Sequence, residues 1–239
     1  MKSTLLVLLA ALVAPASSTT ITIMPASGIA DAVTARSNWL AANFDPDYTL
    51  NVTESFENYL YGPYPALLSS IGTFSVMPGS QPGDPLQSNG DKTNRFAILN
   101  SSDSPYIGRF NTTPGGKGWL DSNDITQLQL TTSLSNTYFF MTDVDDVDGL
   151  LTLKTADGTT ASFQMHLPDG SIYFVGITSD APLGTISWLN SSTNDGFGLD
   201  DFGKIEEPPE VPEPASLPTA AAALIAIIFF TKMKRREVM

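Results

Sequence analysis

The sequence of 239 residues contains no cysteine and one histidine, His166. The lack of cysteine excludes disulfides, a thiol nucleophile and zinc sites built from cysteine. A Ser-His-Asp triad would need His166, which stands among alternating apolar residues typical of a strand, and the sequence has no Gly-x-Ser-x-Gly nucleophile turn. The composition therefore argues against thiol chemistry and against a serine hydrolase.

Basic residues are also scarce. The chain has 12 Lys and Arg against 25 Asp and Glu, which gives a formal net charge of −13. Because Lys2 and the C-terminal tail together carry +4, residues 19–231 carry −17. Such a surface repels phosphate backbones, which argues against nucleic acid as a partner and favours neutral glycans, cations or basic surfaces. A solvated acidic surface without a specific partner is the alternative.

The N-terminus has the layout of a secretory signal peptide. Lys2 precedes the apolar run 5–13, and small residues follow at positions 14–18. The apolar run is too short for a membrane span, which takes about 18 residues or more. We expect residues 1–18 to be the signal peptide, with cleavage near Ser17 or Thr19.

The C-terminus predicts a membrane anchor. Residues 206–216 are rich in Pro and Glu and predict an extended stalk, and the apolar run 220–230 that follows is closed by basic residues. We therefore expect residues 217–239 to form a transmembrane helix with a basic tail. As a helix, residues 217–231 span about 22 Å against a hydrocarbon core of about 30 Å, so snorkelling lysines have to help.

Residues 19–205 lie between these segments and are enough for one extracellular domain with its own core. Residues 28–44 place apolar side chains at helical spacing and end at Asp45-Pro46, which predicts one amphipathic helix. The side expected to face a sheet comprises Ile29, Val33, Arg36, Leu40 and Phe44. A partner-binding groove along this side is the alternative.

Short apolar or alternating runs, separated by turn residues, follow the helix and predict strands. They span residues 50–56, 72–77, 96–99, 106–110, 125–130, 138–142, 150–154, 161–166, 172–177 and 185–189. Asp157-Gly158 and Asp169-Gly170 are typical of hairpin turns. About ten strands with one helix predict an all-β fold, an antiparallel, jelly-roll-like β-sandwich.

One acidic turn is a candidate calcium site, because hard cations bind about six to eight oxygens. Residues 143–149 supply four carboxylates followed by a glycine, namely Asp143, Asp145, Asp146 and Asp148. Their spacing is not that of an EF-hand loop, and a solvated acidic turn is the alternative. A second acidic group is more typical of capping or pairing than of metal binding; it comprises Asp195, Asp200 and Asp201.

Two further kinds of residue are candidates for contact with a sugar. Trp119 follows a glycine-rich segment and could stack on a sugar ring, with core packing as the alternative, and the same two interpretations apply to Trp188. Glu54 and Glu57 are candidates for the paired carboxylates of a glycoside hydrolase, although the sequence does not fix their separation.

The C-terminal segment resembles the PEP-CTERM sorting signal of Gram-negative bacteria. A Pro-Glu-Pro motif, an apolar helix and a basic end stand in the family's order; they are Pro212, Glu213, Pro214, the run 220–230, Lys234, Arg235 and Arg236. The resemblance implies that an exosortase-type enzyme recognises the signal in the inner membrane and cuts near the motif. It further implies that the ectodomain reaches the cell surface or the extracellular matrix.

Shorter motifs in the domain are similar to those of other substrates of this type. They lie at residues 35–40, 53–57, 142–146, 174–177 and 198–202. This resemblance implies sorting and fold but no defined activity. We therefore expect an exported surface or matrix protein, non-enzymatic and either polysaccharide-associated or structural. A secreted glycan-active hydrolase is the alternative, and a membrane-anchored protein whose tail is never cut is a third interpretation.

Overall fold

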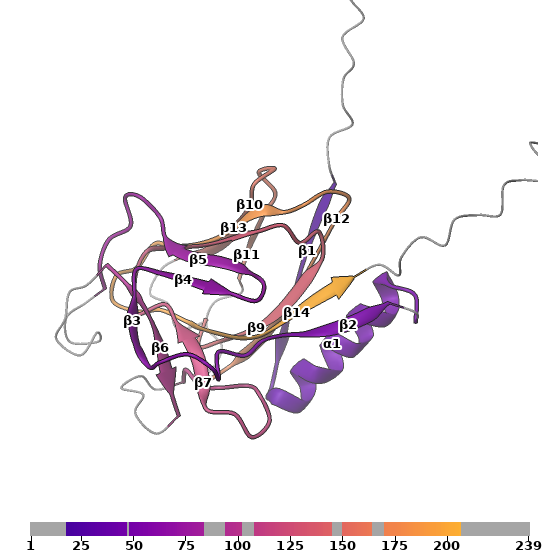
Figure 1. The fold of residues 1–239 in the computed structure, drawn as a ribbon, viewed down its shortest axis with the longest axis horizontal. Coiled ribbons are helices and arrows are strands. Elements are labelled where there is room, and N and C mark those ends of the chain that lie inside the picture. Colours follow the sequence, from indigo (N-terminus) through magenta and orange to yellow (C-terminus); the bar gives the residue numbers. More distant parts are fainter. Residues whose placement is uncertain are drawn as a thin grey trace, which may run out of the picture. The chain divides into compact units, whose positions relative to one another are not determined.

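The computed structural model describes residues 18–46, 48–83, 94–101, 108–144, 150–163 and 170–206. This part of the chain forms one α-helix and 14 strands (Figure 1). The elements are β1 (Thr19–Ala26), α1 (Ile29–Asn43), β2 (Thr49–Glu54), β3 (Gly62–Tyr64), β4 (Ala66–Ser69), β5 (Gly72–Val76), β6 (Phe96–Asn100), β7 (Gly118–Asp121), β8 (Gln127–Thr132), β9 (Thr137–Thr142), β10 (Leu151–Thr155), β11 (Thr160–Ser162), β12 (Ile172–Ser179), β13 (Gly184–Asn190) and β14 (Gly198–Glu206).

Nested pairing of eight strands defines the fold. Strand β7 pairs with β14, β8 with β13, β9 with β12 and β10 with β11, all antiparallel. A chain folded back on itself in this way, with its pairs distributed over two sheets, is a jelly roll. The structure therefore confirms the predicted all-β antiparallel sandwich with one N-terminal helix.

Additional strands widen both sheets. The larger, eight-stranded sheet has the order β1-β12-β9-β14-β7-β6-β3, with β2 also paired to β14. The six-stranded sheet has the order β11-β10-β13-β8-β5-β4. Strand β14 therefore has β9 on one side and both β7 and β2 on the other.

The main core lies between the two sheets and is rich in aromatic rings. In β8, Leu128 and Leu130 are buried while the residues before each of them are partly exposed, as expected for a strand with one face on a core. Deeper in the core, the rings of Phe139 and Phe202 stack with centroids 4.7 Å apart, and Trp188 meets Phe139 edge-on at 5.5 Å. Aromatic burial thus stabilises a domain that has no disulfide.

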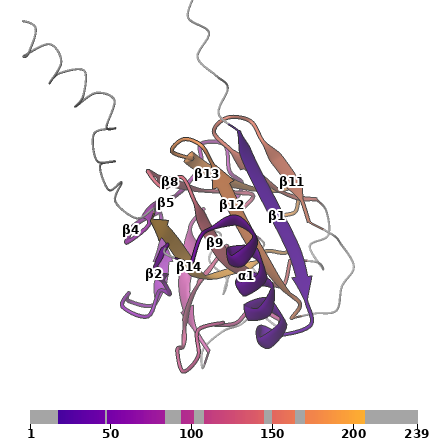
Figure 2. The same ribbon diagram turned by 90° about the vertical axis from the view of Figure 1, so that its right-hand side faces the viewer.

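Helix α1 packs on the outer face of the eight-stranded sheet and forms a second, smaller core there (Figure 2). Ala32 and Trp39 are buried in this interface, and the Trp39 ring lies 5.5 Å from that of Phe174 in β12. Gly176 provides the space, because a Cβ at this position would stand 2.3 Å from the Trp39 ring. The helix is therefore seated on the sheet by the Trp39 ring, which packs directly over Gly176.

The predicted helix is confirmed, and three residues of the side expected to face the sheet, Val33, Leu40 and Phe44, pack against this smaller core. Sequence spacing places Ile29 in the interface, yet it is 38% exposed, whereas Ala32 and Trp39 are buried and were not included. Arg36 lies over the Tyr138 ring, 5.6 Å from its centroid. Trp39, the largest side chain of the helix, fills the space that Gly176 leaves above the sheet.

Most predicted strands are present, with ends shifted by a few residues. The segment 106–110 is an exception, because its described residues, 108–110, form no strand. The ten predicted ranges also omit β1, β3, β4, β7 and β14. Of these, β3, β4 and β7 are only three or four residues long, and β1 directly follows the predicted signal peptide, so a periodic pattern did not separate them from their surroundings.

Several predictions lie outside the described residues. They concern residues 1–17, the stalk after Glu206, the tail with its sorting signal, His166, Asp145, Asp146 and Asp148. In the part of the chain that the structure describes, no helix has the length and apolar character needed to cross a membrane.

Candidate functional site

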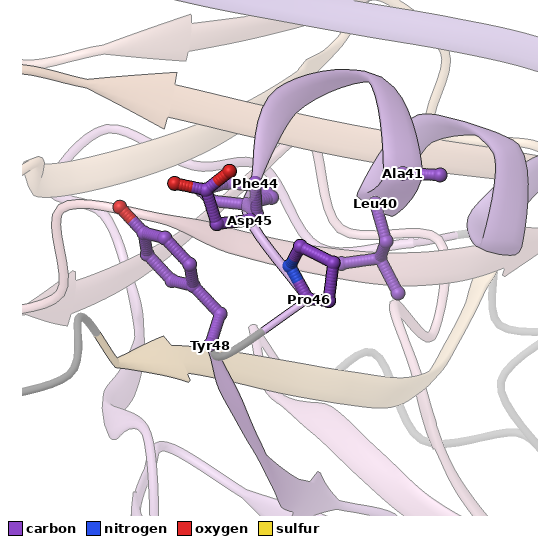
Figure 3. A pocket seen from close by; sticks show the side chains of 6 residues that line it. All are labelled: Leu40, Ala41, Phe44, Asp45, Pro46 and Tyr48. Carbon is purple, nitrogen blue, oxygen red and sulfur yellow. The ribbon is translucent and has the colours of Figure 1, made fainter.

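A hollow of about 280 Å³ lies at the C-terminal end of α1 (Figure 3). We call it the α1 hollow; its lining comprises Leu40, Ala41, Phe44, Asp45, Pro46 and Tyr48. The helix ends here because Phe44 has extended backbone and Pro46 disfavours helical geometry in the residue before it. The Tyr48 N–H donates to the Asp45 carbonyl oxygen at 3.0 Å, which closes the turn that follows the helix.

Aromatic rings form part of the apolar wall of the α1 hollow. The rings of Phe44 and Tyr48 have centroids 5.1 Å apart and are tilted by 60°. Trp39 meets Phe44 edge-on at 5.3 Å. Because Trp39 is buried against the sheet, it fixes Phe44, and Phe44 in turn supports Tyr48. The packing of the domain therefore holds these rings in place without a ligand.

Two polar groups accompany this wall. Figure 3 shows the Asp45 carboxylate and the Tyr48 hydroxyl on the same side, with Leu40 and Pro46 on the other. Within the described residues, neither polar group has a hydrogen-bond partner. An apolar wall with a few hydrogen-bonding groups is typical of small-molecule sites, whose volumes begin at about 300 Å³. The α1 hollow is thus sized for a small group such as one sugar ring.

Trp119, the residue predicted to stack on a sugar, is not at the surface. It lies in β7, between β6 and β14, and its side chain is fully buried. The glycine-rich segment before it ends at Gly118, the first residue of this strand, so the tryptophan points into the domain instead of standing in a loop. Burial contradicts the stacking role for Trp119, and Trp188 is fully buried as well.

Asp143, from the predicted calcium turn, contacts a buried arginine. Arg109 is 5% exposed, and four carboxylates surround its guanidinium group. The N–O distances are 2.8 Å to Asp124 and Asp195 and 3.3 Å to Asp121 and Asp143. We call these five residues the Arg109 cluster. One side chain thereby joins segments up to 86 residues apart in sequence.

The Arg109 cluster carries more negative than positive charge. Burial raises the pKa of Asp121 to about 6, against the opposing effect of Arg109. The pKa of Arg109 is also raised, because Asp121 and Asp124 outweigh the lowering by burial. Asp143 has a left-handed backbone with φ of 60°, and a Cβ at Gly108 would collide with its carboxylate at 2.0 Å. The Arg109 cluster therefore connects separate segments of the domain through buried ion pairs, which is a structural role.

The described residues contain no group of three or more His, Cys, Asp or Glu arranged to hold a metal ion. Asp143 is engaged with Arg109, and its three partners in the predicted calcium site lie outside the described residues. Calcium binding at this turn therefore stays a prediction from the sequence.

The second acidic group divides in the structure. Asp195 belongs to the Arg109 cluster, whereas Asp200 and Asp201 form a pair at an irregularity in β14. Both carboxylates accept hydrogen bonds from the Thr112 hydroxyl, at 3.1 and 3.3 Å. Burial first, and Asp201 second, raise the pKa of Asp200 to about 8. Its Oδ1 has no hydrogen-bond partner in the described part of the chain, so nothing at this oxygen offsets the desolvation that raises the pKa.

Glu54 and Glu57, the candidate pair for glycoside hydrolysis, each bind the protein itself. One oxygen of Glu54 accepts hydrogen bonds from the Tyr59 hydroxyl at 2.9 Å and from the Ser70 backbone N–H at 2.9 Å. One oxygen of Glu57 accepts three, including one from the Gly118 N–H at 2.9 Å. Both carboxylates therefore fasten loops to the sandwich.

Sequence reasoning missed Arg109 and the role of Tyr48. Arg109 lies in the segment 106–110, which the sequence predicted only as a strand, and a scarce basic residue in an acidic chain was the available signal for its role. Tyr48 stands two residues after Pro46, which the sequence analysis used only as a helix stop. An aromatic residue next to such a stop was the corresponding signal for the α1 hollow.

These features define the class of protein as an all-β jelly-roll sandwich with an N-terminal helix. No family model and no curated protein matches the sequence. Among solved structures, the chain is similar to the N-terminal tandem domain CBM22-1-CBM22-2 of Xyn10C from Paenibacillus barcinonensis, with a TM-score of 0.34 and 14% identity. The match covers 70% of this chain and 48% of that chain, so it spans about half of the tandem domain.

Proposed function

We propose that the domain is a non-enzymatic polysaccharide-binding module of an exported protein, with the α1 hollow as its sugar site. The α1 hollow carries this proposal. The Phe44 and Tyr48 rings offer apolar contact for the faces of a sugar, and the Asp45 carboxylate and Tyr48 hydroxyl are available for its hydroxyl groups. The jelly roll also occurs in lectins, which supports the proposal by analogy of fold alone.

The hydrolase alternative has less support from the described residues. Hydrogen bonds engage both Glu54 and Glu57, as described above. Asp200 and Asp201 share one threonine hydroxyl, whereas the two carboxyl groups of a glycosidase flank the sugar at about 5–9.5 Å from each other. We therefore expect the protein to release no reducing ends from a polysaccharide that it retains.

Replacing Tyr48 with alanine removes one ring and one hydroxyl from the α1 hollow and should weaken polysaccharide binding about five- to tenfold. Retention of the full-length protein in gels that contain different polysaccharides measures the effect. The matched control is Tyr61→Ala, because Tyr61 is 50% exposed and lies outside the hollow. Equal retention of the two variants would remove the α1 hollow from the proposal.

Sorting is the second part of the proposed function. The resemblance of the C-terminal segment to a PEP-CTERM signal supports an exosortase-type enzyme as partner, cutting near Pro212, Glu213 and Pro214 before the domain is released to the surface or matrix. Changing these three residues to alanine should leave an uncut, cell-associated precursor. The C-terminal mass of the native protein and the fraction in the medium provide the measurement. Release of the mutant at the wild-type level would refute the sorting role.

A further inference from the structure

We infer that the α1 hollow selects sugars that carry a protonated amine, such as deacetylated hexosamines, over neutral sugars. This inference rests on the proposed function and specifies its ligand. It starts from the charge of the lining: Asp45 is the one charged residue among the six that line the hollow. Its carboxylate is exposed and has no partner within the described residues, so it can accept hydrogen bonds from an ammonium group.

The rings next to Asp45 favour the same ligand. A cation within about 6 Å of an aromatic centroid is attracted by the negative face of the ring. Phe44 and Tyr48 both line the hollow, and Figure 3 shows the Tyr48 hydroxyl on the side of the Asp45 carboxylate. An ammonium group has three donors, enough for both oxygen-bearing groups at once. A neutral hydroxyl or an N-acetyl group would gain less from this combination.

The nearest cation in the helix does not neutralise this site. Arg36 lies one turn before Leu40, but its guanidinium group is placed over the rings of Tyr138 and Phe140, at 5.6 and 5.7 Å from their centroids. The chain as a whole carries a net charge of −13, which attracts a cationic polysaccharide from a distance. Charge complementarity is therefore present both locally and over the whole chain.

The test compares glucosamine hexamer with N-acetylglucosamine hexamer by calorimetric titration of the full-length protein. At about pH 5.5, an amine with a pKa near that of an α-amino group is protonated. We expect the amino form to bind about tenfold more tightly, with an affinity that falls as salt rises. Asp45→Asn should reduce its affinity to that of the acetylated form.

Asp180→Asn is the control for general attraction, because Asp180 is exposed, lies outside the hollow and loses the same charge. The Asp180→Asn variant should bind the glucosamine hexamer with the same affinity as the wild type. Equal binding of the two hexamers, or equal losses in the two aspartate variants, would overturn the inference. If a neutral glucan binds through Tyr48 and the amino form gains nothing, the proposed function stands without the inference. If Tyr48→Ala changes the binding of no sugar, both fail.

Discussion

Replacing Arg109 with methionine is expected to lower the free energy of unfolding by about 3–5 kcal/mol, one of the largest effects of any single substitution in the domain. The guanidinium group is buried and has four carboxylates within 3.3 Å. Its loss leaves these carboxylates in a region of low dielectric without a counter-charge, which costs more than the methionine side chain regains by packing. Urea denaturation followed by fluorescence measures the change.

Two further variants make this expectation specific. Arg95→Met removes the same charge from an exposed side chain and should change stability by less than about 0.5 kcal/mol. Arg109→Lys keeps the charge but loses the planar set of donors that reaches several carboxylates at once, so we expect an intermediate loss. A stability of Arg109→Met close to that of Arg95→Met would show that the Arg109 cluster contributes nothing.

Asp200→Asn is expected to stabilise the protein at about pH 8 by roughly 2–5 kcal/mol and to have little effect near pH 4. Burial raises the folded-state pKa of Asp200 from 3.8 to about 8. Between these values the folded protein keeps a proton that the unfolded chain releases, so the wild type loses stability as the pH rises from about 4 to about 8. Asparagine does not ionise, so the variant lacks the loss of stability that the ionisation of Asp200 causes in the wild type.

Urea denaturation at a series of pH values tests the sign and the range. Asp121, whose pKa burial raises to about 6, acts in the same direction and should leave a smaller slope between about pH 4 and 6 in the variant. Asp180→Asn, at an exposed position, provides the control and should keep the wild-type slope. A pH dependence that is identical in Asp200→Asn and the wild type would contradict the ionisation assigned to Asp200.

Local patterns predicted the fold well because they depend on neighbouring residues. The alternation that buries Leu128 and Leu130 and the spacing that gives residues 28–44 a helix are visible within a few positions. The number and spacing of such strands predicted the fold class, an antiparallel sandwich. They did not predict which strands pair with each other. The burial of Trp39 could not be predicted, because its place above the sheet depends on Gly176, which comes more than 130 residues later.

Sites formed by residues far apart in the chain could not be predicted from the sequence. Arg109 meets partners 12, 15, 34 and 86 residues away, and no spacing rule connects them. Trp119 was misassigned for a related reason: the glycines before it suggested a loop, but β14, from the other end of the domain, pairs with its strand. The acidic turn was recognised as chemically distinctive, while the cation that Asp143 contacts lies elsewhere in the chain.

The position of β14 has a mechanical consequence. It is the last described strand, and the sequence continues from it into the segment predicted to be a stalk and then into the apolar run 220–230. A pull on the chain from this end acts along a strand that is bonded to β9 on one side and to β7 and β2 on the other. Ladder hydrogen bonds lie perpendicular to the strand, so such a force loads many of them in parallel instead of opening them one by one. The predicted C-terminal anchor would therefore transmit tension to the domain through a strand with three paired neighbours.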